Sequence, residues 1–134
     1  YNLMVNFFYT YKFIFYISNL VLLVLYLFPG SILGCHLYND CNLQPQLTED
    51  FLVSSNHFYA LSSLSIIGLL TFKNSHKFNY LIIYLFMLSI ILEILHLFIP
   101  LRSFEFSDLF GNLFGVIFVL IIYFFYRKYE TYKK

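Results

Sequence analysis

Four long apolar stretches follow one another along this chain, at about 13–28, 56–72, 78–99 and 108–126. Each approaches the ~20 residues that a helix needs to cross the ~30 Å hydrocarbon core of a membrane. The chain is 60% hydrophobic and 11% charged, and a soluble domain of 134 residues could not hide that much apolar surface. The sequence therefore predicts an all-α fold, an integral membrane four-helix bundle that forms a single domain over residues 1–134.

The second stretch is the least apolar of the four, because Ser62, Ser63, Ser65 and Gly68 dilute it. Serines on a membrane helix more often pack against a neighbouring helix than face lipid. The first two stretches are therefore interpreted mainly as scaffold.

Positive charges collect on one side of the predicted spans. The Lys and Arg residues on that side are Lys12, Lys73, Lys77, Arg127, Lys128, Lys133 and Lys134. The other side carries Asp40, Glu49, Asp50 and Glu105, with Arg102 as its only Lys or Arg. The positive-inside rule then places both termini and the loop at 73–77 in the cytoplasm. The multi-pass topology predicted for the bacterial cytoplasmic (inner) membrane is N-in and C-in.

The first outer loop contains Cys35 and Cys41, whose spacing permits a disulfide in an oxidising exterior. Cys35, His36 and Cys41 can alternatively offer metal ligands, but no second ligand pair matches them. The run 32–35 also resembles a lipoprotein cleavage site, although we expect the first span to be retained. The chain begins at Tyr1 without an initiator Met, so the true start is expected upstream or is incompletely assigned.

Ionisable residues inside a predicted span are costly in lipid, and they are candidates for function. Glu93 precedes Pro100 by seven residues, which places it ~10 Å below the outer end of the third helix. Ser89, Glu93, His96 and Pro100 are spaced by four, three and four residues, so they share one helix face.

A second polar face begins the fourth stretch. Asp108, Asn112 and Gly115 are spaced by four and three residues, and Gly111 with Gly115 would let another helix approach closely. Arg102 lies in the short loop between the two stretches and can fold back over either carboxylate as a bidentate pair.

The two polar faces lie on adjacent antiparallel helices and are expected to meet in a small pocket near the outer leaflet. Its expected ligand-binding residues are Glu93, His96, Arg102, Asp108 and Asn112. A purely structural interpretation is also open, in which these residues cap and hold together a helical hairpin. In that interpretation Asp108, assisted by Ser107, is the N-cap of the fourth helix.

The run 93–115 resembles the signature of the VanZ-like membrane proteins and covers about a sixth of the chain. That signature joins a Glu and a Gln on one helix, a Pro and an Arg in the loop, and Asp, Asn and Gly on the next helix. The matching residues are Glu93, Pro100, Arg102, Asp108, Asn112 and Gly115. Weaker agreement extends to Pro29, which closes the first span, and to His57-Phe58, which opens the second.

Two departures separate the chain from that family pattern. His96 stands where the family usually has Gln, and it adds a titratable group. The Asp-Lys pair that commonly precedes the His-Phe step is replaced by Val53, Ser54 and Ser55. The resemblance implies a small bacterial envelope protein, in a family associated with low-level resistance to teicoplanin.

Three functions are compatible with these residues. The leading hypothesis is a pocket that binds a polar lipid headgroup or an envelope precursor, with Arg102 on its phosphate or carboxylate. An accessory subunit of a larger membrane complex would dock through its aromatic helices and the face of Gly111 and Gly115. An intramembrane enzyme would use Glu93 or His96 as an acid or base, with Asp108.

No cofactor and no metal is expected, because the sequence lacks a His-x-x-x-His pair. Glu93 and His96 alone have the spacing of an iron ligand pair, and a di-iron bundle needs two such motifs. The predicted partners are membrane lipid and other membrane protein subunits. Nucleic acid is not expected as a partner, since the sequence has no basic patch and no interleaving of aromatic and basic residues.

Overall fold

Helices are the regular secondary structure of this protein over the residues that the structure describes. The computed structural model describes residues 2–133; Tyr1 and Lys134, one of the charges used for the topology, lie outside the described residues. No strand occurs within the described range. The helices are α1 (Asn2–Thr10), α2 (Phe13–Leu27), α3 (Ile32–Tyr38), α4 (Ser55–Phe72), α5 (Phe78–Leu95) and α6 (Phe106–Tyr132).

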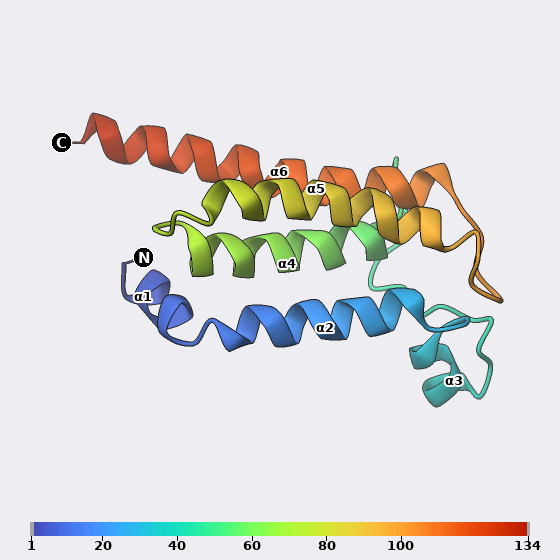
Figure 1. The fold of residues 1–134 in the computed structure, drawn as a ribbon. Coiled ribbons are helices and arrows are strands. Elements are labelled where there is room, and N and C mark those ends of the chain that lie inside the picture. Colours follow the sequence, from blue (N-terminus) through green and yellow to red (C-terminus); the bar gives the residue numbers. More distant parts are fainter. Residues whose placement is uncertain (1, 134) are drawn as a thin grey trace.

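The four long helices lie side by side and alternate in direction (Figure 1). Helix α1, the α4–α5 turn and the end of α6 lie at one end of the molecule (Figure 1). Helix α3 and the α5–α6 loop lie at the other end, which we call the α3 end. The core draws on all four long helices, with Leu22, Leu61, Leu85 and Val116 among its buried side chains.

Two helices, α5 and α6, are long and apolar enough to cross a membrane by length and composition. Residues 3–10 and 13–27 pass the same test together, although they are bent by 71° at the break between them, and they would add a third span. Helix α4, predicted as a span, is not among these, because Asn56, His57 and its serines lower its hydropathy.

The serines of α4 lie partly inside the protein, as their polarity led us to expect. Ser62 and Ser65 are buried, whereas Ser63 is exposed. The Ser62 hydroxyl donates a hydrogen bond of 3.3 Å to the carbonyl of Gly115 on α6. These contacts describe a helix that is enclosed by its neighbours rather than one that faces lipid all round.

The helix ends differ from the predicted boundaries in two places. Helix α5 stops at Leu95 and not at 99, because the next amides bond three residues back, as His96 N–H does to the Glu93 carbonyl at 3.2 Å. Helix α6 begins two residues before the predicted span and continues to Tyr132, past the charged positions that end the apolar stretch. Helices α1 and α3 were not predicted at all, since a long hydropathy window does not detect such short elements.

The glycines of α6 set how closely α4 packs. A Cβ atom at Gly111 would lie 2.7 Å from the Ser54 carbonyl oxygen, and one at Gly115 would lie 2.6 Å from that of Phe58. Both distances are too short for any side chain, so α4 and α6 meet backbone to backbone. The close approach predicted for this glycine pair occurs, and α4 of the same chain occupies it.

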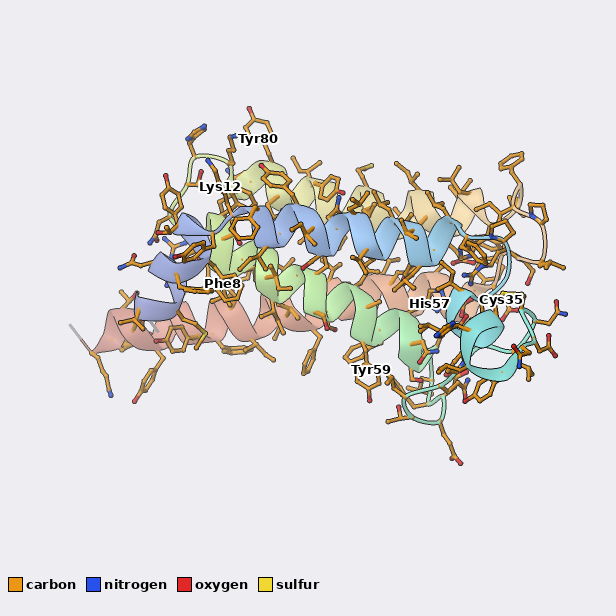
Figure 2. All side chains as sticks on the ribbon, turned by 90° about the horizontal axis from the view of Figure 1, so that it is seen from below. Phe8, Lys12, Cys35, His57, Tyr59 and Tyr80 are labelled. Atoms are coloured by element: carbon orange, nitrogen blue, oxygen red, sulfur yellow. A yellow bond between two sulfur atoms is a disulfide. The ribbon has the colours of Figure 1, made fainter. Side chains whose placement is uncertain are left out.

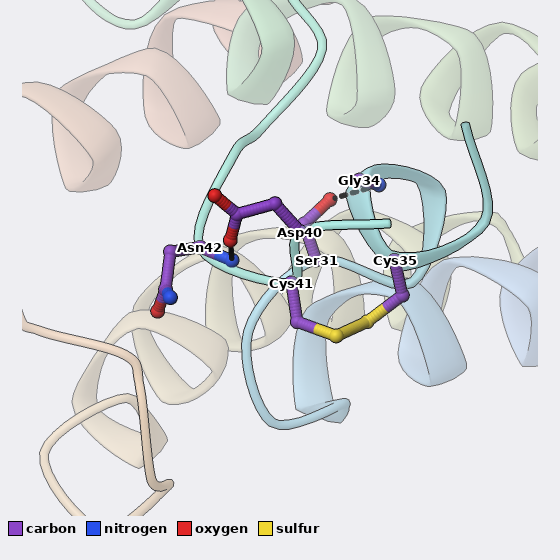
Figure 3. Close-up of a disulfide and its surroundings, with 6 residues drawn as sticks. All are labelled: Ser31, Gly34, Cys35, Asp40, Cys41 and Asn42. Carbon is purple, nitrogen blue, oxygen red and sulfur yellow. Dashed lines mark hydrogen bonds between the residues drawn. A yellow bond between two sulfur atoms is a disulfide. The ribbon is translucent and has the colours of Figure 1, made fainter. Parts of the chain in front are cut away.

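The long loop at the α3 end is closed by a disulfide. Cys35 on α3 is bonded to Cys41 just beyond it (Figure 3). The Ser31 side chain caps α3 by accepting a hydrogen bond of 2.9 Å from Gly34 N–H, and Ser31 N–H donates to the Cys41 carbonyl at 2.8 Å. Covalent and hydrogen bonds together close residues 31–41 into a compact loop.

Candidate functional site

A cavity of about 650 Å³ opens at the α3 end of the molecule. His57 lies at this end with Cys35, while Lys12 lies at the opposite end (Figure 2). The cavity receives titratable or polar side chains from α2, α4, α6 and the α5–α6 segment. Among those side chains are Tyr26, His57, His96, Arg102, Glu105 and Asp108.

Glu93 and His96 form a fully buried pair. The exposed fraction is 0% for Glu93 and 1% for His96, and Nδ1 of His96 lies 3.2 Å from Oε2 of Glu93. The other carboxylate oxygen, Oε1, accepts a hydrogen bond of 2.9 Å from the backbone N–H of Glu105. Glu93 therefore joins α5 to the residue that precedes α6.

Asn112 holds a second buried connection. Its Oδ1 accepts a hydrogen bond of 2.6 Å from the Tyr26 hydroxyl, and its Nδ2 donates to the Ser89 carbonyl at 3.2 Å. Asn112 is fully buried and cannot bond to solvent, so these two hydrogen bonds satisfy its amide in place of water. One amide thus ties α6 to both α2 and α5.

His57 connects α4 to α6. Its Nδ1 lies 2.9 Å from the Ser54 hydroxyl and 3.5 Å from Oδ1 of Asp108. Asp108 lies in the first turn of α6, where the helix dipole favours a negative charge. Asp108 is not the N-cap that the structural interpretation assigned to it, since α6 begins earlier and Glu105 holds that position.

Arg102 does not form the bidentate carboxylate pair that its loop position suggested. Its guanidinium donates to the carbonyl of Leu25 at 2.8 Å and to that of Phe28 at 3.3 Å, at the C-terminal end of α2. Burial lowers the pKa of Arg102 from its ordinary value, and the charge of Asp108 opposes that shift. A guanidinium has five N–H donors and keeps its charge in proteins, so two carbonyls leave donors for a ligand.

Three of the five predicted site residues line the cavity: His96, Arg102 and Asp108. Glu93 and Asn112 are buried behind its wall and hold the helices that carry the others. Sequence reasoning treated the first two long helices as scaffold and so missed His57 and Tyr26 as wall residues. The signal for His57 was the weak agreement of His57-Phe58 with the family pattern at the start of the second span.

His57, Glu93 and His96 are close enough to share a metal ion. One ligand atom from each lies within 4.8 Å of the other two. The sequence suggested no metal because these residues come from separate parts of the chain, and only the Glu93 and His96 spacing was visible. The cavity wall thus combines a cation, Arg102, with two histidines and three carboxylates, which are Asp50, Glu105 and Asp108.

No protein-family model, curated protein or solved structure matches this chain.

Proposed function

We propose that this chain is a VanZ-like protein of the bacterial cytoplasmic membrane that binds a polar lipid headgroup or an envelope precursor in the cavity at its α3 end. In this proposal α2, α4, α5 and α6 all cross the membrane, both termini are cytoplasmic and the cavity faces outward. The observation that carries it is the cavity of about 650 Å³, with the half-buried Arg102 in its wall.

Arg102 is the residue best suited to the anionic part of such a ligand. The carbonyls of Leu25 and Phe28 hold its guanidinium in place before any ligand arrives. A planar guanidinium matches the oxygens of a phosphate or carboxylate in two parallel hydrogen bonds. A fixed Arg also loses less side-chain freedom when it binds, which favours affinity.

The distribution of charge supports an outward-facing cavity. Lys12 lies at the end opposite His57 (Figure 2), and α6 carries Arg127 and Lys128 toward that same end (Figure 1). The disulfide of Cys35 and Cys41 lies beside the cavity and would be stable in an oxidising exterior. Both features agree with the positive-inside orientation.

Replacing Arg102 with Gln should remove the bound ligand. We expect the copurifying anionic lipid or precursor to fall by about 10-fold to 100-fold, since a hydrogen bond to a charged group contributes ~1.5–3 kcal/mol. The measurement is mass spectrometry of lipids extracted from the purified full-length protein. Arg127→Gln, an exposed position at the other end of α6, is the matched control. Equal lipid retention in both variants, with unchanged thermal unfolding, would contradict the proposal.

The orientation has its own test through the disulfide. In intact cells we expect Cys35 and Cys41 to react with a membrane-impermeant maleimide only after reduction with an impermeant phosphine, because the bridge blocks both thiols. The Cys35→Ser variant should react without reduction. Labelling that appears only after the cells are permeabilised would place the α3 end in the cytoplasm and reverse the proposed topology.

An accessory role in a larger membrane complex has lost one of its two arguments. The glycine face that was expected to receive a partner is covered by α4 of the same chain. The other argument is that aromatic side chains on α6 are exposed, among them Phe114, Phe118 and Phe125. Lipid can cover these side chains as well as a partner protein can. Lipid or precursor binding therefore has more direct support.

A further inference from the structure

The hydrogen bond of His96 to Tyr26 determines which ring nitrogen of His96 carries a hydrogen and which one faces Glu93. Nε2 of His96 is 3.0 Å from the Tyr26 carbonyl oxygen, which can only accept a hydrogen bond, so Nε2 carries the hydrogen. In a neutral imidazole Nδ1 then presents a lone pair. That lone pair faces Oε2 of Glu93 at 3.2 Å.

Oε2 of Glu93 is fully buried and takes no hydrogen bond from residues 2–133. A lone pair and a carboxylate oxygen repel one another unless a positive charge lies between them. A proton or a metal ion can supply that charge. A third ligand nearby favours a metal ion, since a proton between two atoms needs none.

His57 provides the third ligand. Its nitrogen lies within 4.8 Å of the ligand atoms of both Glu93 and His96. Bonds of ~2.0–2.1 Å around a tetrahedral ion separate neighbouring ligand atoms by ~3.3 Å. The His96 and Glu93 atoms, 3.2 Å apart, already have that separation. The His57 nitrogen, within 4.8 Å of both, would have to move closer by up to ~1.5 Å to complete the set.

The far nitrogens of both histidines are held as they are in metal sites. A ligating His almost always donates its other ring N–H to a carboxylate or a backbone carbonyl. Nε2 of His96 donates to the Tyr26 carbonyl. Nδ1 of His57 lies 2.9 Å from the Ser54 hydroxyl and 3.5 Å from Asp108, so in the tautomer with its hydrogen on Nδ1 it faces two acceptors. Nε2 of His57 is then the nitrogen available to a metal.

We propose that His57, Glu93 and His96 bind one divalent transition-metal ion, with Zn²⁺ as the best fit, and leave a fourth position open to the cavity. Two imidazoles and one carboxylate suit Zn²⁺ and disfavour Mg²⁺ and Ca²⁺, which take oxygen ligands. Glu93 neutralises one of the two charges, and Asp108 beyond His57 offsets the other. The fourth position takes water or an anionic oxygen, so the ion would face the same ligands as Arg102. The site does not depend on lipid binding.

The test is metal binding by the purified full-length protein in detergent, stripped with a chelator and reloaded with ZnCl₂ alone. We expect one Zn²⁺ per chain, and Co²⁺ substituted for it should give the visible absorption of a four-coordinate nitrogen and oxygen site. His96→Gln and His57→Gln should each bind Zn²⁺ more than about 100-fold more weakly, because loss of an outer partner alone costs ~10–100-fold. His76→Gln, an exposed histidine in the α4–α5 turn, is the matched control.

Several results would overturn the metal site. They are a wild-type chain that takes up no Zn²⁺, a His57→Gln or His96→Gln chain that binds it as tightly as wild type, or a His76→Gln chain that loses it equally. If His96→Gln does not fold, His57→Gln decides, since His57 is only partly buried. Lipid content measured in the same preparations separates the two proposals. Zinc bound without lipid supports this site alone, and lipid bound without zinc supports only the headgroup cavity.

Discussion

Replacing Gly115 with Ala is expected to destabilise the fold although the mutation adds a single methyl group. The new Cβ would lie 2.6 Å from the Phe58 carbonyl oxygen and 3.0 Å from Ser62 N, both backbone atoms of α4. Backbone atoms cannot change rotamer as side chains can, so α4 and α6 must move apart to accommodate the methyl group. Overpacking of this kind typically costs ~1–3 kcal/mol, and it exceeds the ~1 kcal/mol that Ala gains over Gly in a helix.

The measurement is thermal unfolding of the purified protein in detergent, compared with Gly68→Ala. Gly68 lies on α4, and a Cβ there would meet only side-chain atoms, Leu81 Cδ1 at 3.0 Å and Phe15 Cε2 at 3.1 Å. Those side chains can adjust, so we expect Gly68→Ala to be close to neutral. Equal unfolding temperatures for the two variants would show that α4 and α6 are not held at this distance.

Hydropathy predicted α2, α5 and α6 well because it is a local property of the sequence. Helix α2 covers Phe13–Leu27 against a predicted 13–28, and α5 begins at Phe78 as expected. Helix α4 also forms where the sequence placed it, but its membrane crossing is not supported by length and composition. A helix that is enclosed by others tolerates serines because they contact protein and not lipid, and hydropathy alone cannot detect that enclosure.

The site was predicted in part, and the missing part depends on long-range contacts. Spacing placed Glu93 and His96 on one face, and they meet because His96, the C-cap of α5, still has helical backbone angles. The prediction that Arg102 pairs with a carboxylate was wrong. It rested on charge complementarity, whereas the guanidinium donates to the Leu25 and Phe28 carbonyls at the end of α2. His57 and Tyr26 reach the cavity only because α4 folds against α6 and α2 folds against α4 and α5, and no local pattern encodes that.

Replacing Glu93 with Ala is expected to have the largest effect of any single polar change. The mutation removes the acceptor of the Glu105 N–H and the partner of His96 at 3.2 Å, and it leaves both groups buried or half-buried without compensation. A part-buried N–H left without an acceptor costs ~1–3 kcal/mol, and the loss of the carboxylate that faces His96 adds to that cost. The start of α6 should loosen first, since Glu93 is what holds Glu105 against α5.

Glu93→Gln separates the two roles of this carboxylate. Its amide oxygen can still accept the Glu105 N–H, so most of the folding stability should return, while the negative charge that faces His96 is lost. Hydrogen exchange at the first turn of α6, followed by mass spectrometry, should therefore be fast in Glu93→Ala and near wild type in Glu93→Gln. If Glu93→Gln exchanges as fast as Glu93→Ala, the charge rather than the Glu105 hydrogen bond positions α6. If neither variant differs from wild type, Glu93 does not join α5 to α6.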